Sequence, residues 1–329
     1  MDPIRWGILS TGNIANQFAK GLQVLDDAEL VAVGSRSQSS ADEFAKKYDI
    51  PHSHGSYEAL ANDPDVDVIY IGSPHSHHHE HMMLCLNGGK HILCEKAFTL
   101  TAAEAEECIN LAQEKGLFLM EAMWTRFLPG IVKLREWLAD GKLGKVEYFR
   151  SEFSFHGTFN PEHRLWNPEL GGGALLDLGV YNVAMASMVL GVPDSVDSHI
   201  LKAPTGVDRQ TTMFFKYDDG AAATLMCSFT ANTPMQALII GDKGWARIEH
   251  RFYEGKQITR QIHGQDAEVF EVPYESTGYQ HEAAEVMACI RAGKLESDIM
   301  PLDETLALMK LMDGVRHQWG ISYPVEQQG

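Results

Sequence analysis

The hydrophobic and polar positions in the first third of the chain alternate between two periods. Short apolar runs, typical of buried strands, occur at residues 4–9, 30–33, 66–71, 91–94 and 118–120. Between and after them, apolar residues recur every three or four positions, as in helices, at residues 14–24, 41–48, 57–60, 78–86, 102–115 and 131–139. Strands that alternate with helices predict βαβ units, and therefore a parallel sheet with right-handed connections.

The pattern changes after about residue 145. Apolar and polar residues alternate, as in half-buried strands, at residues 146–155, 195–201, 211–217, 221–229, 235–240 and 245–250. Two segments between them, Asp218-Asp219-Gly220 and Asp242-Lys243-Gly244, have the composition of hairpin turns. This part predicts a mainly antiparallel sheet covered by an apolar helix at 174–190, with later helices at 282–291 and 304–319.

We therefore predict two domains, as is usual for a chain of 329 residues. Residues 1–122 form an α/β Rossmann domain, a doubly wound parallel sheet that binds a dinucleotide. Residues 123–329 form an α+β domain with an open, mainly antiparallel sheet, which binds the substrate and mediates oligomerisation.

The charge of the chain narrows the choice of partners. It has 27 Lys and Arg against 45 Asp and Glu, a net charge of −18. We expect neither nucleic acid nor a membrane as partner, because binding to such polyanions depends on clustered positive charge. The first 122 residues carry 8 basic and 18 acidic side chains. A small anionic ligand still fits there, because the N–H groups of a helix N-terminus and one or two cations can hold a phosphate.

Cysteine usage and the apolar segments bear on the location of the protein. The five cysteines lie far apart and form no CxxC pair, which is typical of reduced thiols and predicts a cytoplasmic protein. The N-terminus has no basic region followed by an apolar stretch, so we expect no signal peptide. The apolar segment 174–190 contains Asp177 and Asn182 and is short for a membrane span, so we interpret it as a buried helix.

The first predicted strand ends in a turn that partly matches the dinucleotide-binding motif GxGxxG/A. The three motif positions hold Ser10, Gly12 and Ala15, so the first glycine is missing. Gly12 still permits the backbone to approach a pyrophosphate, and Ala15 permits close packing of helix on strand. The alternative is a tight turn without a ligand, but the position of this turn at the head of a βαβ series favours a dinucleotide.

The end of the second strand distinguishes between the two dinucleotides. NAD sites place Asp or Glu there to bind the ribose 2′-hydroxyl, whereas this chain has Ser35 and Arg36. Serine can donate to a phosphate oxygen, and arginine can pair with a 2′-phosphate. We therefore predict NADP(H) as the cofactor, with NAD as a second possibility; the alternative for Arg36 is a solvated loop charge.

Three further motifs carry a resemblance to a known family. They are Cys94-Glu95-Lys96-Ala97, the run from Met120 to Phe127, and the run from Gly171 to Tyr181. With these motifs the sequence resembles, over essentially its whole length, the glucose–fructose oxidoreductase / inositol dehydrogenase / MocA family (Gfo/Idh/MocA). Within that family it is most similar to the dihydrodiol dehydrogenase branch, whose members also act as NADP-dependent D-xylose dehydrogenases.

The resemblance implies roles for individual residues. Lys96 matches the catalytic lysine of the family's EKP motif, and Asp177 and Tyr181 match a D-x-x-x-H/Y pair on a helix of the second domain. His75 and His78 fall where the branch has an H-x-x-H at the mouth of the cofactor cleft. The expected cofactor contacts are Ser10, Thr11, Gly12, Asn13, Ile14, Ser35, Arg36, Ser73, His75, His78, Glu95 and Lys96. The expected substrate contacts are Trp124, Arg126, Phe153, Asp177 and Tyr181.

The chain departs from the family pattern at three positions. Ala97 stands where the EKP motif has proline, so the sequence leaves open whether the Lys96-Ala97 peptide is cis or trans. Tyr181 stands where many members of the family have histidine. The dihydrodiol dehydrogenase branch has tyrosine at this position. Ser40 stands where some NADP-using relatives have a second basic residue.

Oxidation of a carbinol requires a base for the hydroxyl proton as the hydride leaves carbon. Asp177 and Tyr181 are four residues apart, so they share one face of a helix. Free tyrosine has a pKa of about 10, and a nearby ammonium such as Lys96 favours the phenolate. We therefore assign Tyr181 as the general acid/base, Lys96 as its electrostatic partner and Asp177 as the residue that orients substrate or lysine. The alternative is a core aromatic at 181 and a capping or paired carboxylate at 177.

Residues 75–81 contain a cluster of histidines that needs separate treatment. His77 and His81 are four residues apart on a predicted helix, a spacing that can bind zinc. The sequence identifies no third ligand, so we interpret them as surface histidines and expect no metal.

The predicted function is hydride transfer between NADP(H) and a sugar, polyol or cyclic diol carbon. A reductase for a keto- or anhydro-sugar is one alternative, since the same residues would serve in reverse. A non-catalytic NADP-sensing or partner-binding protein is another, but it would not need Lys96 and Tyr181 together. A zinc-dependent dehydrogenase would need ligands that the cysteines do not supply. By analogy, we expect a homodimer or higher homo-oligomer that forms through the sheet of the second domain.

Overall fold

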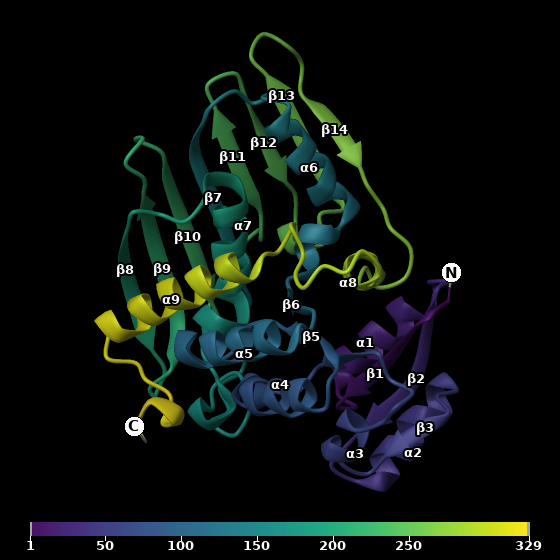
Figure 1. Ribbon diagram of the computed structural model, residues 1–329. Coiled ribbons are helices and arrows are strands. Elements are labelled where there is room, and N and C mark those ends of the chain that lie inside the picture. Colours follow the sequence, from purple (N-terminus) through teal and green to yellow (C-terminus); the bar gives the residue numbers. More distant parts are fainter. Residues whose placement is uncertain (1, 328–329) are drawn as a thin grey trace. The chain divides into compact units, whose positions relative to one another are not determined.

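The computed structural model describes residues 2–327 and divides into two compact units (Figure 1). The first unit comprises Met1–Trp124 and Glu275–Met309, and the second comprises Thr125–Tyr274 and Lys310–Gly329. The sequence analysis assigned everything after residue 122 to the second domain and did not anticipate the return of 275–309. Arg291 Nη1 lies 2.6 Å from Asp27 Oδ2, and Thr277 donates to Gln17 O at 2.9 Å. These contacts tie the returning segment to the first unit.

The sheet of the first unit has six strands in the order β3-β2-β1-β4-β5-β6, and each neighbouring pair is parallel. This is the strand order of the Rossmann fold, in which the chain reverses direction across the sheet between β1 and β4. The strands are β1 (Ile4–Leu9), β2 (Ala28–Gly34), β3 (His52–His54), β4 (Val68–Ile71), β5 (His91–Glu95) and β6 (Leu119–Ala122). The polar, three-residue β3 was not predicted, because it has no apolar run.

Three helices of the first unit begin directly after residues whose side chains cap them. The side chains of Ser37, Ser56 and Thr101 accept N–H bonds from the first turns of α2, α3 and α5, as such N-caps do. The helices are α1 (Asn13–Leu22), α2 (Gln38–Tyr48), α3 (Tyr57–Ala61), α4 (His78–Asn87), α5 (Ala102–Lys115) and α8 (Gln280–Arg291). α9 (Leu302–Gln318) starts in the first unit and continues into residues of the second.

The sheet of the second unit has eight strands in the order β14-β13-β12-β11-β7-β10-β9-β8. β7 and β10 are parallel and the other pairs are antiparallel, as the sequence predicted for the sheet as a whole. β13 and β14 escaped prediction because polar and charged residues dominate both. The strands are β7 (Val146–Ser154), β8 (Ser195–Lys202), β9 (Asp208–Lys216), β10 (Ala222–Ser228), β11 (Ala237–Gly241), β12 (Gly244–Ile248), β13 (Gln257–Ile262) and β14 (Glu268–Glu271).

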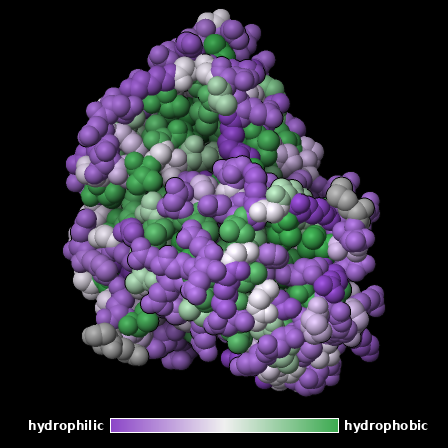
Figure 2. All heavy atoms as spheres, viewed as in Figure 1, coloured by the Kyte–Doolittle hydropathy of each residue, from purple (hydrophilic) through white to green (hydrophobic). Residues whose placement is uncertain are grey.

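Helices cover one face of this sheet. α7 (Val180–Leu190) packs on β7 and β10, and α6 (Pro129–Ala139) lies against β14 through Trp137 and Phe270. On the side viewed in Figure 1, hydrophobic residues gather over this sheet within a hydrophilic rim (Figure 2). The segment Pro168–Leu190 has the length and composition of a membrane span, but 83% of its apolar window is buried inside the protein, as in the core helix that the sequence predicted.

The opposite face of the sheet carries exposed apolar side chains. Phe214 of β9 is 41% exposed, Ile240 of β11 is 36% exposed and Val269 of β14 is 60% exposed. Ile240 pairs across the sheet with Tyr148 and Trp245, so these three side chains lie in one row on that face. The open sheet expected from the sequence is therefore present.

Candidate active site

The glycine turn follows β1 and leads into α1. Ser10 occupies the position of the missing glycine with a φ of 94°, which few residues other than glycine adopt. Its backbone N–H donates to Gly34 O at 3.0 Å and its hydroxyl donates to Gly72 O at 2.8 Å. Ser10 thus keeps the backbone shape of the motif and links the turn to the loops after β2 and β4.

The N-terminus of α1 suits an anionic ligand. Gly12 is the N-cap, and among the described residues no side chain caps it. A Cβ at Gly12 would meet nothing nearer than Ser10 Oγ at 3.9 Å, so the approach to the first N–H groups is open. Thr11, Asn13 and Ile14 flank this opening at the carboxyl ends of β1 and β4, where the strand order reverses and Rossmann folds bind the pyrophosphate of their dinucleotides. The turn therefore fits a dinucleotide.

The end of β2 carries the residues that the sequence associated with a 2′-phosphate. Ser35 is buried, with its N–H bonded to His54 O at 3.0 Å, and Arg36 is exposed directly after it. The charge of Arg36 helps to lower the pKa of His81 to about 4, although burial is the main cause, followed by His77 and His78. Arg36 therefore places a cation at the end of β2, with the neutral His81 near it.

His78 links the loops after β4 and β5. It is fully buried; Nδ1 lies 2.9 Å from Ala97 O and Nε2 lies 2.8 Å from Ser73 O. Burial lowers its pKa, and the bonds to the backbone carbonyls oppose this effect. The sequence placed His78 at the mouth of the cofactor cleft, whereas here both ring nitrogens contact backbone carbonyls and hold the loop that follows Lys96. The buried His75 lies beside it, with ring centroids 5.7 Å apart.

The other histidines of the cluster do not form a three-ligand metal group in the described part of the chain. His77 and His81 stack with centroids 5.7 Å apart, and His81 Nδ1 lies 2.9 Å from Ser73 Oγ. His81 is buried rather than on the surface, contrary to the interpretation from the sequence.

Lys96 follows β5 at the edge of the sheet that carries the glycine turn. Its peptide bond to Ala97 is cis, although alanine replaces the motif proline. Its backbone N–H donates to Glu95 Oε2 at 3.2 Å, and Tyr70 Oη donates to Glu95 Oε1 at 2.5 Å. Glu95, which was predicted as a cofactor contact, therefore anchors the backbone of Lys96 through Oε2 and accepts the Tyr70 hydroxyl through Oε1.

A second buried carboxyl lies near Glu95. Glu282 of α8 is fully buried, and burial together with the charge of Glu95 holds its pKa well above the ordinary value. In the same returning segment, Tyr279 stacks on Trp124 with centroids 4.8 Å apart and 15° between planes. The sequence offered no signal for either contact, because α8 lies more than 150 residues from its partners.

In the second unit, Asp177 and Tyr181 lie at the start of the helix predicted for them. Leu175–Gly179 forms a π-helical turn that runs into α7, a feature often found at functional sites. Both side chains are buried. Arg164 Nη1 lies 2.8 Å from Asp177 Oδ1, and the arginine side chain is 52% exposed. Sequence analysis missed Arg164, because it stands in an irregular loop with no motif around it.

The three glycines before this helix are Gly171, Gly172 and Gly173, and the last of them packs against Asp208. Asp208 is fully buried, and its Oδ2 accepts from Leu175 N at 2.8 Å and from Thr211 Oγ1 at 2.7 Å. Gly173 has a φ of 128°, and a Cβ there would come within 2.4 Å of Asp208 Oδ1. Burial raises the pKa of Asp208 to about 6. Asp208 and the glycines thus fix the start of the helix that carries Asp177 and Tyr181.

Aromatic rings surround Tyr181. Phe153 and Tyr253 stack with centroids 4.3 Å apart and 10° between planes, and the ring of Tyr181 lies 5.4 Å from Phe153 and 5.6 Å from Tyr253. Thr125 donates to Tyr253 O at 2.8 Å, which fixes that segment. Phe153 was predicted as a pocket residue and Tyr253 was missed, because it lies in a short 3₁₀ helix, Phe252–Glu254, far along the chain.

Arg126 was predicted to line the substrate pocket. It is buried, and its Nη2 donates to Ala184 O of α7 at 2.8 Å. Arg126 therefore helps to hold the helix that carries Tyr181. Trp124, two residues earlier, belongs to the first unit.

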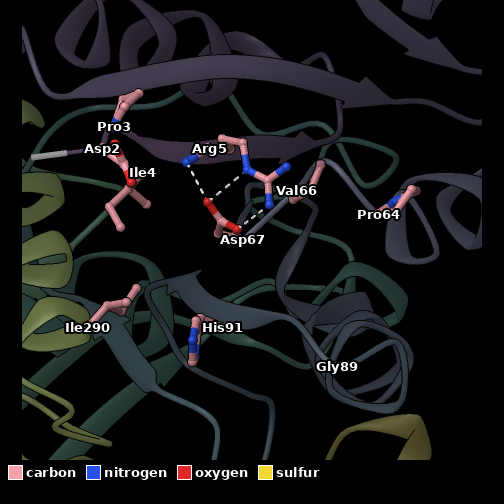
Figure 3. Close-up of a pocket in the computed structure, with 10 residues that line it drawn as sticks. All are labelled: Asp2, Pro3, Ile4, Arg5, Pro64, Val66, Asp67, Gly89, His91 and Ile290. Carbon is pink, nitrogen blue, oxygen red and sulfur yellow. Dashed lines mark hydrogen bonds and ion pairs between the residues drawn. The ribbon is translucent and has the colours of Figure 1, made fainter.

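A separate hollow of about 560 Å³ lies at the amino ends of the strands of the first unit (Figure 3). Arg5 spans it with bonds to Asp67, the shorter of which joins Nη2 to Oδ1 at 2.7 Å. None of the residues predicted from the sequence lines it. Rossmann folds bind dinucleotides at the carboxyl ends of their strands, so this hollow is not the cofactor site.

Comparison with known proteins decides the family. Residues 4–123 match the model of the oxidoreductase family with an NAD-binding Rossmann fold, and residues 131–247 match that of the GFO/IDH/MocA C-terminal domain. The chain is 37% identical to the trans-1,2-dihydrobenzene-1,2-diol dehydrogenase of Mus musculus, over 99% of each sequence. The chain belongs to the Gfo/Idh/MocA oxidoreductase family.

Solved structures of other oxidoreductases share the fold. The chain aligns with KijD10, a 3-ketoreductase from Actinomadura kijaniata in complex with NADP and TDP-benzene, at 24% identity and a TM-score of 0.81, over 96% of this chain and 97% of that one. It aligns with the aldose-aldose oxidoreductase of Caulobacter crescentus at 24% identity and a TM-score of 0.85, with the same coverage. These neighbours confirm the predicted fold class, a Rossmann domain followed by an α+β domain.

Proposed function

We propose that this Gfo/Idh/MocA protein is an NADP(H)-dependent dehydrogenase that acts on a CH–OH group of a sugar, polyol or cyclic diol. The observation that carries the proposal is the similarity along the whole chain to a dihydrodiol dehydrogenase. The glycine turn and Arg36 support NADP(H), and the NADP in the structure of KijD10 is consistent with it. The mouse relative is a dehydrogenase of trans-1,2-dihydrobenzene-1,2-diol, which favours a cyclic diol among these substrates.

The proposed chemistry uses one group from the first unit and two from the second. A bound nicotinamide dinucleotide would supply the acceptor for the hydride of the carbinol carbon. Tyr181 accepts the hydroxyl proton as the C=O bond forms, and Lys96 supplies the positive charge that favours the phenolate. Asp177, fixed by Arg164, orients the substrate hydroxyl through its carboxylate. In the reductive direction, Tyr181 returns the proton to the carbonyl oxygen, so a keto- or anhydro-sugar reductase would use the same groups.

The aromatic surroundings of Tyr181 support a substrate with a flat or apolar face. Phe153 and Tyr253 present two stacked rings beside the proposed acid/base. Aromatic rings bind planar rings and the C–H faces of sugars by burying apolar surface. A cyclic diol or a pyranose fits this wall, whereas a short, strongly charged acid does not.

The test is a cofactor and substrate screen. Purified protein is mixed with NADP+ or NAD+ and a panel of cyclic diols, aldoses and inositols, and reduction of the nicotinamide is followed by absorbance. We expect turnover of at least one cyclic diol or aldose with NADP+. Tight NADP binding without turnover of any substrate would instead favour a sensing or partner-binding protein, and equal use of NAD+ would contradict the role of Arg36.

We also propose that the protein is a cytoplasmic homodimer that uses the open face of the second-unit sheet. The five free, buried cysteines support a reducing compartment, and the row formed by Tyr148, Ile240 and Trp245 supports an apolar interface. Sedimentation should give a dimer for the wild type and a monomer for Ile240→Asp. Phe159→Asp, an exposed aromatic outside the strands, is the matched control and should remain dimeric.

A further inference from the structure

A second group of chemically reactive side chains lies in the first unit, away from the glycine turn. His52 and His54 stand two residues apart on β3, so their side chains point to the same face of the strand. His52 Nδ1 lies 2.7 Å from Asp63 Oδ2, and His54 Nε2 lies 2.8 Å from the same oxygen. Two imidazoles and one carboxylate therefore converge on a single point.

We propose that His52, His54 and Asp63 form a binding site for one divalent transition-metal ion of the Zn²⁺ type. The three ligand atoms lie within 4.8 Å of one another, and the group is the one such cluster found among residues 2–327. Two imidazoles and a carboxylate are borderline ligands that suit Zn²⁺, Co²⁺ and Ni²⁺ rather than Ca²⁺ or Mg²⁺. Water would complete a four-coordinate ion.

The geometry needs little adjustment to accept the ion. Ligand atoms around a tetrahedral Zn²⁺ with bonds of about 2.0–2.1 Å stand about 3.3 Å apart. The two nitrogens are now 2.7 and 2.8 Å from Asp63 Oδ2 and within 4.8 Å of each other. To bind the ion, each ring must withdraw from the carboxylate by about 0.5 Å, and the two nitrogens must come to lie about 3.3 Å apart. His52 and His54 are half-buried at an edge strand and have room to do so, whereas the Asp63 side chain is only 3% exposed and stays in place.

The surroundings hold the carboxylate as a second coordination shell does. Asp63 Oδ1 accepts the N–H of Asp65 at 2.9 Å, and Lys90 Nζ donates to Asp63 O and Val66 O. The bonds from Asp65 N and from the two histidines lower the pKa of Asp63 to about 2, against the effect of its burial. Asp63 is therefore ionised at neutral pH, as a ligand must be.

Asp65 supplies a partner for the distal nitrogen of one ligand. Its Oδ2 lies 3.9 Å from His52 Nε2, and its Oδ1 lies 3.3 Å from Nη1 of Arg5, which also binds Asp67. Metal-bound histidines commonly direct their second nitrogen to a carboxylate, which fixes the tautomer that leaves the other nitrogen free to bind. An ion bound at His52 Nδ1 leaves Nε2, which faces Asp65, as the nitrogen that carries the ring proton.

The position of the site suggests what the ion would do. β3 has three residues, lies at the edge of the sheet, and pairs with β2 directly before Ser35 and Arg36. His54 O accepts the N–H of Ser35 at 3.0 Å. An ion that joins β3 to the loop after α3 would brace this edge of the sheet and stabilise the folded chain.

The test uses the full chain after treatment with a chelator. Titration with Zn²⁺ by calorimetry should show one ion per chain, and thermal unfolding should shift to a higher Tm. Co²⁺ should give visible absorption that Zn²⁺ abolishes. Ligating histidines must be neutral, so the affinity should fall as the pH is lowered. These measurements do not depend on the dehydrogenase activity, so their failure would leave the proposed function untouched.

The variants are chosen to keep the hydrogen bonds of the cluster while removing the imidazoles. In His52→Asn and His54→Gln, an amide N–H can replace the ring N–H that faces Asp63. Each should weaken Zn²⁺ binding more than about 100-fold. Asp65→Asn should weaken it by about 10- to 100-fold, the usual effect of changing a carboxylate that faces the second nitrogen of a metal-bound histidine. His79→Ala, which removes another histidine paired with a single carboxylate, Glu107, is the control and should bind Zn²⁺ like the wild type.

Three results would overturn the site. They are no binding and no shift in Tm with Zn²⁺ or Co²⁺; binding that survives the double change His52→Asn and His54→Gln; and binding that is lost in His77→Ala, which would place the ion in the 75–81 cluster. If a ligand variant does not fold, the Co²⁺ absorption and stoichiometry of the wild type, together with His77→Ala, still decide the question.

Discussion

Arg164 Nη1 lies 2.8 Å from Asp177 Oδ1, so an arginine from an irregular loop fixes a carboxylate at the start of the helix that carries Tyr181. The arginine side chain is half-exposed and that of Asp177 is almost completely buried. A charge-assisted bond from an arginine holds a carboxylate in a defined orientation. The pair therefore makes Arg164 a candidate for positioning the substrate-binding group.

Arg164→Ala should lower kcat/KM by about 10- to 100-fold, because a hydrogen bond to a charged partner is worth about 1.5–3 kcal/mol. NADP affinity should stay unchanged. Arg164→Lys should restore part of the activity by retaining the charge. Arg209→Ala, an exposed arginine of β9, is the matched control. Steady-state kinetics and cofactor titration check this, and equal loss in both alanine variants would remove Arg164 from the site.

Tyr181→Phe should lower kcat by about 100- to 10,000-fold, the range for loss of a general acid/base. Tyr253→Phe provides a close control, because its ring lies 5.6 Å from that of Tyr181. Removing its hydroxyl keeps the aromatic wall, so kcat should change little. Full activity in Tyr181→Phe, or matching losses in both variants, would contradict the proposed proton transfer.

Arg36→Ala should weaken NADP binding by about 10- to 100-fold through loss of a charge-assisted bond to the 2′-phosphate. NAD binding should hardly change, because NAD lacks that phosphate. Lys46→Ala, an exposed cation of α2, controls for the loss of one positive charge in an acidic unit. Fluorescence titrations with both dinucleotides measure the effect. A parallel fall in NAD affinity would show that Arg36 does not recognise the 2′-phosphate.

Asp208 should make the stability of the protein depend on pH between about 4 and 6. Burial raises its pKa from 3.8 to about 6, so the folded protein holds the proton more tightly than the unfolded chain. Its contribution is fully present below pH 3.8 and is lost as the pH rises through 6, a change of about 3 kcal/mol. Asp208→Asn should remove this dependence. Urea unfolding of both proteins at several pH values measures it, and parallel curves would refute the assignment.

The hydrophobic pattern was sufficient for most elements of the fold. Alternating short runs and helical periods identified five of the strands of the first sheet, because buried parallel strands need continuous apolar residues whatever their partners. β3, β13 and β14 were not predicted, because polar residues interrupt their apolar pattern. These strands form through backbone pairing, β3 with β2 and β13 with β14. The return of 275–309 to the first unit escaped for a related reason, since a single contact such as Arg291 with Asp27 joins residues far apart in sequence.

The candidate site likewise contains residues that the sequence predicted and residues that only the structure identified. The sequence predicted Gly12 and Arg36 from their positions at strand ends, and it predicted Lys96, Asp177 and Tyr181 through the resemblance to the family. The tertiary structure decided how Ser10 replaces a glycine, that Arg126 holds α7, and that Arg164, Tyr253 and Glu282 join buried groups. It also brought His52 and His54 to Asp63. The spacing of apolar residues along the sequence indicates which face of a helix or strand is buried. The partner of each buried polar group depends on contacts that form only in the folded chain.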